Sequence, residues 1–565
     1  MEYIYSSGNG TTKDKKKAFQ RYLKSAARGN NVGQYNLGDC YFFGIGTTKD
    51  EGKAFHWYLK SAEGKNSNGQ LSLGNCYKYG IGKTKNDDNA FKWYLKSAKG
   101  GNSDGQFNLA TCYFFEIGTT KDEKKAFQWY LKSAKGGNSD GQFCLGCCYE
   151  NGIGTTKNEK KTFQWYLKSA EGGNCIGQFS LGKCYNNGIG TKKVEQKAFK
   201  WYLKSAEGGN SNGQYGLGTC YLNGIGTTKD NEKAFQLYLK SAEGRNSNGQ
   251  CGLGYCYLNG IGTTKDKKKA FELYLESARG GNSIGQYNLG NCYLNGDGTT
   301  KNEEQAFQWY LKSAEGGSSY GQGNLGYCYL NGIGTTKNKE QAFQWYKKCA
   351  EEGNHLGENN LGYCFHGGIG TKKDEEKAFQ WYRKSAEGGN YWGQNNLGDC
   401  YRNGIGTEED EEKAFQWYLK SAEGGNHSGQ NNLGYCYKYG IGTIKDDEKA
   451  IHWYSISAKG GNSYAQTSLR NVNESKKTKD DEEKIFCWYL KSAKEGNTDG
   501  QNKLGYCYLL GIGTTKDDKK AFQWYEKSAK GGNSSGQYSL ANCYFYGIGT
   551  IQDRKKAIFW YIKSS

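Results

Sequence analysis

Residues 33–66 read GQYNLGDCYFFGIGTTKDEGKAFHWYLKSAEGKN, and close copies of this stretch recur along the chain with a period of 36 residues. A Gly-Gln dipeptide opens almost every copy, and its second residue marks the period. The marked position holds Gln34, Gln70, Gln106, Gln142, Gln178, Gln214, Gln250, Gln286, Gln322, Glu358, Gln394, Gln430, Gln466, Gln501 and Gln537, with a deletion before Gln501. Repeats of this length are typical of solenoids, in which each unit buries its apolar face against its neighbours.

Each copy is predicted to form two helices. The first spans residues 33–43, where Leu37, Cys40 and Tyr41 have the spacing of one buried helical stripe. The glycine-rich turn at 44–47 ends it, since glycine reaches left-handed dihedrals without steric cost. Glycine or alanine fills the place of Gly38 in every copy except Arg470, which predicts close contact between two backbones.

The second helix is predicted to begin after Asp50. Asp or Asn holds this place in fifteen of sixteen copies, Val194 being the exception, as expected for an N-cap. Downstream residues at helical spacing form a wide core stripe: Ala54, Trp57, Tyr58, Ser61 and Ala62. The aromatic members of this stripe are therefore interpreted as packing residues.

The motifs Leu-Gly-x-Cys-Tyr, Gly-Ile-Gly-Thr and Asp-x-x-Lys-Ala-Phe-x-Trp-Tyr-x-Lys-Ser-Ala resemble the Sel-1-like repeat, a relative of the tetratricopeptide repeat, over essentially the whole chain. The resemblance implies a right-handed superhelix of antiparallel helix pairs, with first helices lining a concave face. Members of this family are mostly adaptors, including ubiquitin-ligase adaptors of endoplasmic-reticulum degradation and fungal chitin-synthase regulators. The chain departs from the family in having no proline and in having Ser-Ala where Ala-Ala is usual.

The expected fold is therefore an all-α solenoid of about fifteen repeats. Four segments are predicted: a partial first repeat with only its second helix (1–32), a regular array (33–465), a degenerate repeat (466–500), and two last repeats of which the final one is truncated (501–565). Solenoid ends normally need polar caps, so the chain is predicted either to self-associate through its ends or to be part of a longer polypeptide.

Composition narrows the class of protein. The chain has 565 residues and a formal charge of +19, with neither a signal peptide nor an apolar run long enough to span a membrane, which predicts a cytoplasmic protein. Fourteen of its twenty cysteines share one repeat position: Cys40, Cys76, Cys112, Cys148, Cys184, Cys220, Cys256, Cys292, Cys328, Cys364, Cys400, Cys436, Cys507 and Cys543. One cysteine per repeat indicates a small buried apolar residue rather than a disulfide, and a reducing compartment.

Partner choice is expected at positions that vary between copies and face outward. Tyr35, Asp39 and Phe42 define such a stripe on the first helix, which the tetratricopeptide resemblance places on the concave face. The predicted partner-binding residues are Tyr35, Asp39, Phe107, Tyr215, Tyr255, Tyr287, Tyr327, Asn359, Tyr363, Asn395, Asn431, Tyr435 and Tyr506. Exposed Tyr and Asn suit recognition of proteins or extended peptides. The alternative is neutral variation at solvated positions.

Lysine recurs at the Lys60 place in fourteen of sixteen copies, broken by Glu276 and Ile456. The side chain is expected on the outer face, as a ladder of ammonium groups that nucleic acid or an anionic membrane could use. Because each lysine stands among Asp, Glu and Gln, simple solvation of the outer face is the competing interpretation.

Catalytic and metal-binding motifs are not found. The five histidines lie in distant copies, and Gly80–Thr84 lacks the first glycine and the preceding strand of a phosphate-binding loop. Cys144, Cys147 and Cys148 cluster, but nothing completes a zinc ligand set, and a redox role stays open.

We expect a non-enzymatic scaffold without cofactor or metal. The runner-up functions are nucleic-acid or membrane binding, and a regulatory arm of a missing kinase or other catalytic domain.

One copy breaks the pattern. In the block opened by Gln466 the core places hold Arg470, Val472 and Asn473, and the glycine turn is replaced by a segment containing Lys476. This predicts a hinge or an exposed basic loop. A decayed repeat is the alternative.

Overall fold

A computed structural model describes residues 12–474 and 479–564 of the chain. Within these ranges there are 31 α-helices and no strand, which confirms the all-α prediction. The first helices of the repeats are α3 (Asn31–Phe43), α5 (Ser67–Tyr79), α7 (Ser103–Phe115), α9 (Ser139–Asn151), α11 (Cys175–Asn187), α13 (Ser211–Asn223), α15 (Ser247–Asn259), α17 (Ser283–Asn295), α19 (Ser319–Asn331), α21 (His355–Gly367), α23 (Tyr391–Asn403), α25 (His427–Tyr439), α27 (Ser463–Glu474), α29 (Thr498–Leu510) and α31 (Ser534–Tyr546).

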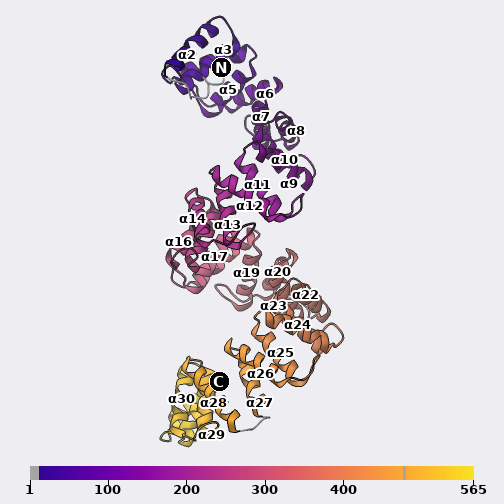
Figure 1. The fold of residues 1–565 in the computed structure, drawn as a ribbon, viewed down its shortest axis with the longest axis vertical. Helices are drawn as coiled ribbons and strands as arrows, with labels where there is room; N and C mark the ends of the chain where they lie inside the picture. Colours follow the sequence, from indigo (N-terminus) through magenta and orange to yellow (C-terminus); the bar gives the residue numbers. More distant parts are fainter. Residues whose placement is uncertain (1–11, 475–478, 565) are drawn as a thin grey trace. The chain divides into compact units, whose positions relative to one another are not determined.

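The second helices alternate with them along the chain (Figure 1). They are α2 (Thr12–Ala27), α4 (Glu51–Glu63), α6 (Asp87–Lys99), α8 (Glu123–Lys135), α10 (Glu159–Glu171), α12 (Glu195–Glu207), α14 (Asn231–Glu243), α16 (Lys267–Arg279), α18 (Glu303–Glu315), α20 (Lys339–Glu351), α22 (Glu375–Glu387), α24 (Glu411–Glu423), α26 (Asp447–Lys459), α28 (Lys479–Lys494), α30 (Asp518–Lys530) and α32 (Arg554–Ser564).

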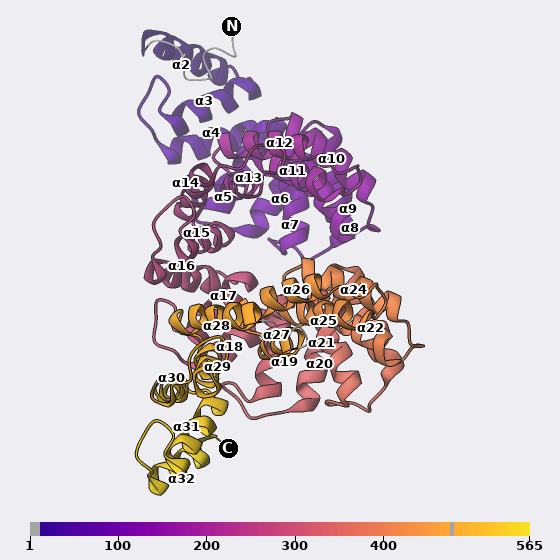
Figure 2. The same cartoon turned by 60° about the horizontal axis from the view of Figure 1, so that its bottom comes forward.

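The helices group into two compact units, Met1–Gly316 and Gly317–Ser565. In each unit a first helix packs against its own second helix, and that second helix packs against the first helix of the next repeat. First helices also meet across repeats, as α11 meets α13 in the first unit and α21 meets α23 in the second. Successive helix pairs of each unit follow a curved path in Figure 2, and the converging first helices lie on its inner side.

Capping fixes where the helices start. Asn30 Oδ1 accepts a hydrogen bond from Gly33 N at 2.8 Å before α3, and Asp50 Oδ1 accepts one from Lys53 N at 2.9 Å before α4. Gly44 ends α3 with φ 71°, a left-handed conformation that favours glycine. Val194 precedes α12 without a side-chain cap. The predicted N-caps are confirmed for the regular second helices such as α4, and Val194 is confirmed as an exception. The prediction was wrong for two copies, because α2 begins at Thr12, before Asp14, and α28 begins at Lys479, before Asp481.

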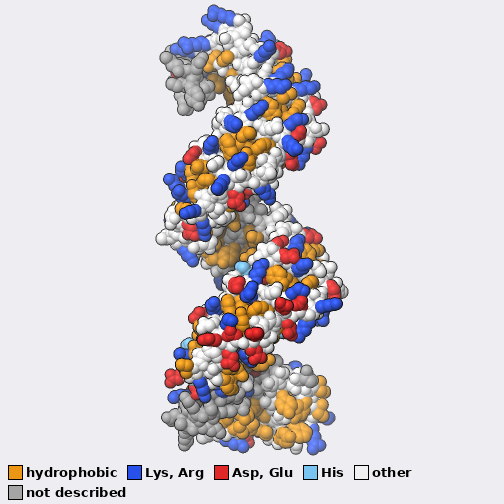
Figure 3. Space-filling model, turned by 90° about the vertical axis from the view of Figure 1, so that its right-hand side faces the viewer, with side chains coloured by type: hydrophobic (Ala, Val, Ile, Leu, Met, Phe, Trp, Pro, Cys, Tyr) orange, Lys and Arg blue, Asp and Glu red, His pale blue; other side chains and the backbone are white. Residues whose placement is uncertain are grey.

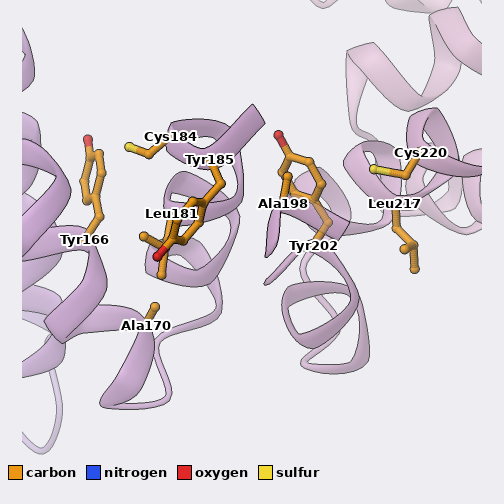
Figure 4. Close-up of a cluster of buried hydrophobic side chains, with 9 residues drawn as sticks. All are labelled: Tyr166, Ala170, Leu181, Cys184, Tyr185, Ala198, Tyr202, Leu217 and Cys220. Atoms are coloured by element: carbon orange, nitrogen blue, oxygen red, sulfur yellow. The ribbon is translucent and has the colours of Figure 1, made fainter. Parts of the chain in front are cut away.

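Each core cluster is assembled from two to four successive helices. In Figure 4, Tyr166 and Ala170 of α10 lie beside Leu181 of α11, and the cluster continues through α12 to Leu217 and Cys220 of α13. These side chains are almost fully buried, with Leu181 at 0% exposure. Because each cluster uses residues from adjacent repeats, no repeat buries its apolar face alone.

The glycine at the Gly38 place serves a different contact from the one predicted. A Cβ at Gly38 would lie 2.6 Å from Cδ1 of Tyr58, and one at Gly74 would lie 2.6 Å from Cε1 of Tyr94. The prediction of two backbones in contact was wrong, since the close neighbour is the ring of the buried tyrosine on the second helix.

The repeated cysteines are free and buried, as the sequence predicted for a small apolar residue. Burial raises the pKa of Cys40, Cys76 and Cys184 to about 12. These thiols are therefore protonated at neutral pH and act as core residues.

Two further predictions concern single segments. No helix in the described part of the chain combines the length and apolarity that crossing a bilayer requires.

In the degenerate repeat, α27 and α28 are both present, but Lys476 and the side chains of Arg470, Val472 and Asn473 lie outside the described residues. The hinge therefore stays a prediction.

Candidate functional site

The inner face of the second unit carries a cluster of exposed aromatic side chains. Tyr327 on α19 and Tyr363 on α21 are 48% and 49% exposed, and Tyr439 at the end of α25 is 56% exposed. Tyr435 is partly exposed, and its ring lies 4.6 Å from that of Tyr439. The Arg402 guanidinium of α23 lies 4.8 Å from the centroid of the Tyr435 ring. We call Tyr327, Tyr363, Arg402, Tyr435 and Tyr439 the inner tyrosine cluster.

An asparagine network joins the helices beneath this cluster. Asn396 Nδ2 donates to Asn359 Oδ1 at 2.9 Å, which links α23 to α21, and Asn432 Nδ2 donates to Asn395 Oδ1 at 3.0 Å, which links α25 to α23. Asn359 and Asn395 are buried, so their amides hold neighbouring repeats in register. Asn431 is half-buried, and its side-chain oxygen has no partner in the described structure.

A half-buried carboxylate completes the network. Asp399 accepts hydrogen bonds from the Tyr418 hydroxyl at 2.7 Å and from Asn395 Nδ2 at 3.1 Å. Burial raises the pKa of Asp399, and the bond from Tyr418 and the charge of Arg402 oppose that shift. This is the part of the inner face where aromatic, amide and charged groups meet.

In the first unit the predicted residues lie deeper. The rings of Tyr35, Phe107, Tyr215 and Tyr287 pack against the buried tyrosine of their own repeat, with centroids 6.2, 6.0, 5.8 and 6.2 Å apart. Asp39 accepts a 2.7 Å hydrogen bond from the Tyr58 hydroxyl, and burial raises its pKa. These side chains cover the core more than they project from it.

The remaining two predicted residues differ from each other. Tyr255 on α15 is 45% exposed, whereas Tyr506 on α29 is only partly exposed. Of the predicted residues in the second unit, Tyr327, Tyr363 and Tyr435 are exposed or partly exposed on first helices, whereas Asn359 and Asn395 are buried in the asparagine network.

Sequence reasoning missed a second aromatic surface. Phe43, Tyr79 and Phe115 end α3, α5 and α7 in three consecutive repeats, and each is about two-thirds exposed. The Phe42 and Phe43 rings meet edge to face at 4.8 Å. The detectable signal was an aromatic residue directly before the glycine turn, a place held by asparagine in most later copies.

The lysine ladder lies on the exposed side of the second helices. The lysine ammonium lies 3.8–5.2 Å from the indole centroid of the tryptophan three residues earlier in the pairs Lys60–Trp57, Lys96–Trp93, Lys132–Trp129, Lys168–Trp165, Lys204–Trp201, Lys312–Trp309, Lys348–Trp345, Lys384–Trp381, Lys420–Trp417, Lys527–Trp524 and Lys563–Trp560. Such cation–π contacts are worth roughly 0.5–1 kcal/mol at exposed sites. Basic and acidic side chains are interspersed on the face of the molecule that Figure 3 shows.

The clustered cysteines Cys144, Cys147 and Cys148 do not form a reactive centre. Burial raises the pKa of Cys144 and Cys148 to about 12 and also raises that of Cys147, which accepts a hydrogen bond from Tyr166. No group of three metal-ligating side chains occurs among the described residues. Buried Glu358, at the glutamine place, is neutralised by Lys384 at 3.0 Å and contacts His355 at 2.8 Å.

Comparison with known families identifies the repeats. The Sel1 repeat family matches fifteen segments of the chain. The chain belongs to the Sel1 repeat family. The matched segments are residues 3–30, 32–66, 67–102, 103–138, 139–174, 176–210, 211–246, 247–282, 283–318, 319–354, 355–390, 393–426, 427–462, 498–533 and 534–565. The unmatched stretch 463–497 contains most of the degenerate repeat.

Solved Sel1 repeat structures resemble the chain over long stretches. A protective antigen of uropathogenic Escherichia coli strains, which displays an SLR fold, is 34% identical with a TM-score of 0.51, over 81% of this chain and 98% of that one. A Sel1 repeat protein of Oxalobacter formigenes is 33% identical with a TM-score of 0.40, over 43% of this chain and 96% of that one. The curated proteins that were searched contain no match.

Proposed function

We propose that this Sel1 repeat chain is a non-enzymatic scaffold that binds proteins or extended peptides on the inner face of its first helices. The observation that carries the proposal is the inner tyrosine cluster, in which Tyr327 and Tyr363 of neighbouring repeats are about half exposed and Arg402 lies over the ring of Tyr435. Tyr and Arg are enriched among residues that dominate protein interfaces.

The surroundings of the cluster support this assignment. The asparagine network ties α21, α23 and α25 together, so the exposed rings stand on a rigid base. A rigid base lowers the entropy lost on binding. Neighbouring rings on successive repeats also suit an extended ligand, which contacts several repeats at once.

A pull-down from cell lysate tests the proposal with two variants of the full chain. The inner variant combines Tyr327→Ala, Tyr363→Ala and Tyr435→Ala, and the outer variant combines Lys348→Gln, Lys420→Gln and Lys527→Gln. We expect a discrete set of proteins that survives nuclease treatment, is lost with the inner variant and is kept by the outer one. Removal of an aromatic hot spot typically costs about 2 kcal/mol or more.

The same experiment separates the nucleic-acid alternative. If the lysine ladder were the working surface, the outer variant would lose its ligand, nuclease would release the captured proteins, and retention would fall steeply with salt because phosphate contacts release counterions. That result would overturn the scaffold proposal.

A further inference from the structure

A cavity of about 500 Å³ lies between α26 and α28 in the second unit, on the side of the second helices. Its lining includes Ser455 and Lys459 from α26 and Trp488, Lys491 and Ser492 from α28. Small-molecule sites commonly enclose 300–1,000 Å³. The cavity is therefore large enough for a small organic ligand.

The cavity lies where one leucine of the repeat pattern is replaced by serine. Leucine at the place of Leu59 packs in the same cluster as the tryptophan of the following repeat, as Leu131 does with Trp165 and Leu419 with Trp453. At the step from α26 to α28 the leucine place holds Ser455, and the tryptophan place holds Trp488. The absent isobutyl group leaves space beside the indole.

Within the described chain, the hydroxyl of Ser492 also lacks the hydrogen bond that the equivalent serine makes in most repeats. In most repeats the residue at the Ser61 place is a fully buried serine that donates to a carbonyl of its first helix, as Ser457 does to His427 O and Ser528 to Thr498 O, both at 2.6 Å. Ser492 is only partly buried and makes no hydrogen bond to a described residue. Its hydroxyl is free to donate to a ligand in the cavity.

Charge decides the class of ligand. Lys459 and Lys491 contribute two ammonium groups to the lining, and Glu495 contributes one carboxylate, so the lining is net positive. The indole of Trp488 offers a flat apolar surface against which an aromatic ring can stack. We propose that this cavity binds a small aromatic carboxylate, with its ring against Trp488 and its carboxylate between Lys459, Lys491 and the Ser492 hydroxyl.

Titration calorimetry with 2-naphthoate on the full chain tests the proposal. We expect measurable binding, at least tenfold weaker binding of the neutral 2-naphthamide, and at least tenfold weaker binding of 2-naphthoate by Lys491→Gln. Ser455→Leu introduces the leucine that most repeats have at this place, so this variant keeps the fold while filling the cavity, and it is expected to abolish binding. Lys420→Gln changes the same repeat place in α24 and should bind as the unaltered chain does.

The proposal is overturned if the unaltered chain does not bind 2-naphthoate, or if Ser455→Leu binds it equally well. Binding of the amide as tightly as the acid would also overturn it, since the lysines would then contribute nothing. The inner variant with three tyrosine substitutions is expected to bind 2-naphthoate normally, so the scaffold function and this site can fail separately.

Discussion

At the scale of single residues, close contacts between helices leave some positions of the repeat with no room for a side chain. The glycine at the Gly33 place lies against the residue at the Ser61 place of the preceding second helix, which is serine in most copies. In the pair Gly285–Ser277 an added Cβ would overlap the serine hydroxyl. All regular copies have glycine here, whereas the degenerate repeat has Ala465. In that repeat the methyl group of Ala465 is fully buried against α26, in the same core cluster as Tyr454 and Ala458.

Substitution Gly285→Ala tests this contact. In an unconstrained helix the change would stabilise by roughly 1 kcal/mol, because alanine is the better helix former. Overpacking against Ser277 is expected to reverse the sign and cost about 1–3 kcal/mol. Urea denaturation followed by circular dichroism measures the difference. A neutral or stabilised variant would show that the serine yields to the methyl group.

A second prediction at this scale concerns the buried tyrosine hydroxyls. Tyr94 donates to Asn75 Oδ1 at 2.8 Å, whereas the equivalent place in the repeat of Tyr382 holds Tyr363, whose ring is exposed. Tyr94→Phe should therefore cost about 0.5–1.5 kcal/mol, the net value of a typical hydrogen bond. Tyr382→Phe, the matched control, should cost less. Equal losses measured by denaturation would contradict a contribution from the Asn75 bond.

At the scale of helices, the sequence predicted most of the fold. The N-caps of the regular repeats, their glycine turns and the core stripes follow from local patterns that act within one repeat. The register of Asn396 on Asn359 and the cation–π pairing of Lys60 with Trp57 did not follow, because they depend on side-chain conformations and on contacts between repeats. The cavity beside Trp488 was hidden for the same reason.

The acidic caps give a pH dependence. Hydrogen bonds from the helix amides and from a nearby lysine lower the pKa of Asp50, Asp122, Asp230, Asp374, Asp410, Asp446, Asp517 and Asp553 below the usual 3.8. A lowered folded-state pKa stabilises above the unfolded value, and this stability is lost as pH falls through the folded value. The raised pKa values of Asp39 and Asp399 act in the opposite direction, but they are fewer.

We therefore expect the melting temperature to fall between pH 6 and pH 3. The triple variant Asp50→Asn, Asp122→Asn and Asp230→Asn keeps a capping oxygen but cannot titrate, and Asn86 and Asn158 already cap equivalent helices. Its melting temperature should fall less over the same range. An identical fall, recorded by circular dichroism, would exclude the caps as the cause.

At the scale of the whole molecule, the chain is two compact arrays of nearest-neighbour contacts. Stability in such arrays is approximately a sum of repeat and interface terms, so a part can fold without the rest. Residues 1–316 and 317–565 are each expected to fold when expressed alone, with helical signals that sum to that of the full chain. An unfolded spectrum for either half would contradict the division.

Function at this scale was only partly readable from the sequence. The resemblance to the Sel-1-like repeat implied which helices line the inner face, but the exposure of side chains along that face had to come from the structure. Tyr327 and Tyr363 are exposed, whereas Asn359 and Asn395, at equally variable positions, are buried in the network between repeats. Variation between copies alone does not separate a partner contact from a contact between repeats.

The central claim is that partners bind the inner face of the first helices. Site-specific photocrosslinking tests it most directly, with a benzophenone amino acid placed at Tyr363 on the inner face or at Lys348 on the outer face. In nuclease-treated lysate the account predicts discrete protein adducts from position 363 and none from position 348. Adducts formed only from position 348 would contradict it.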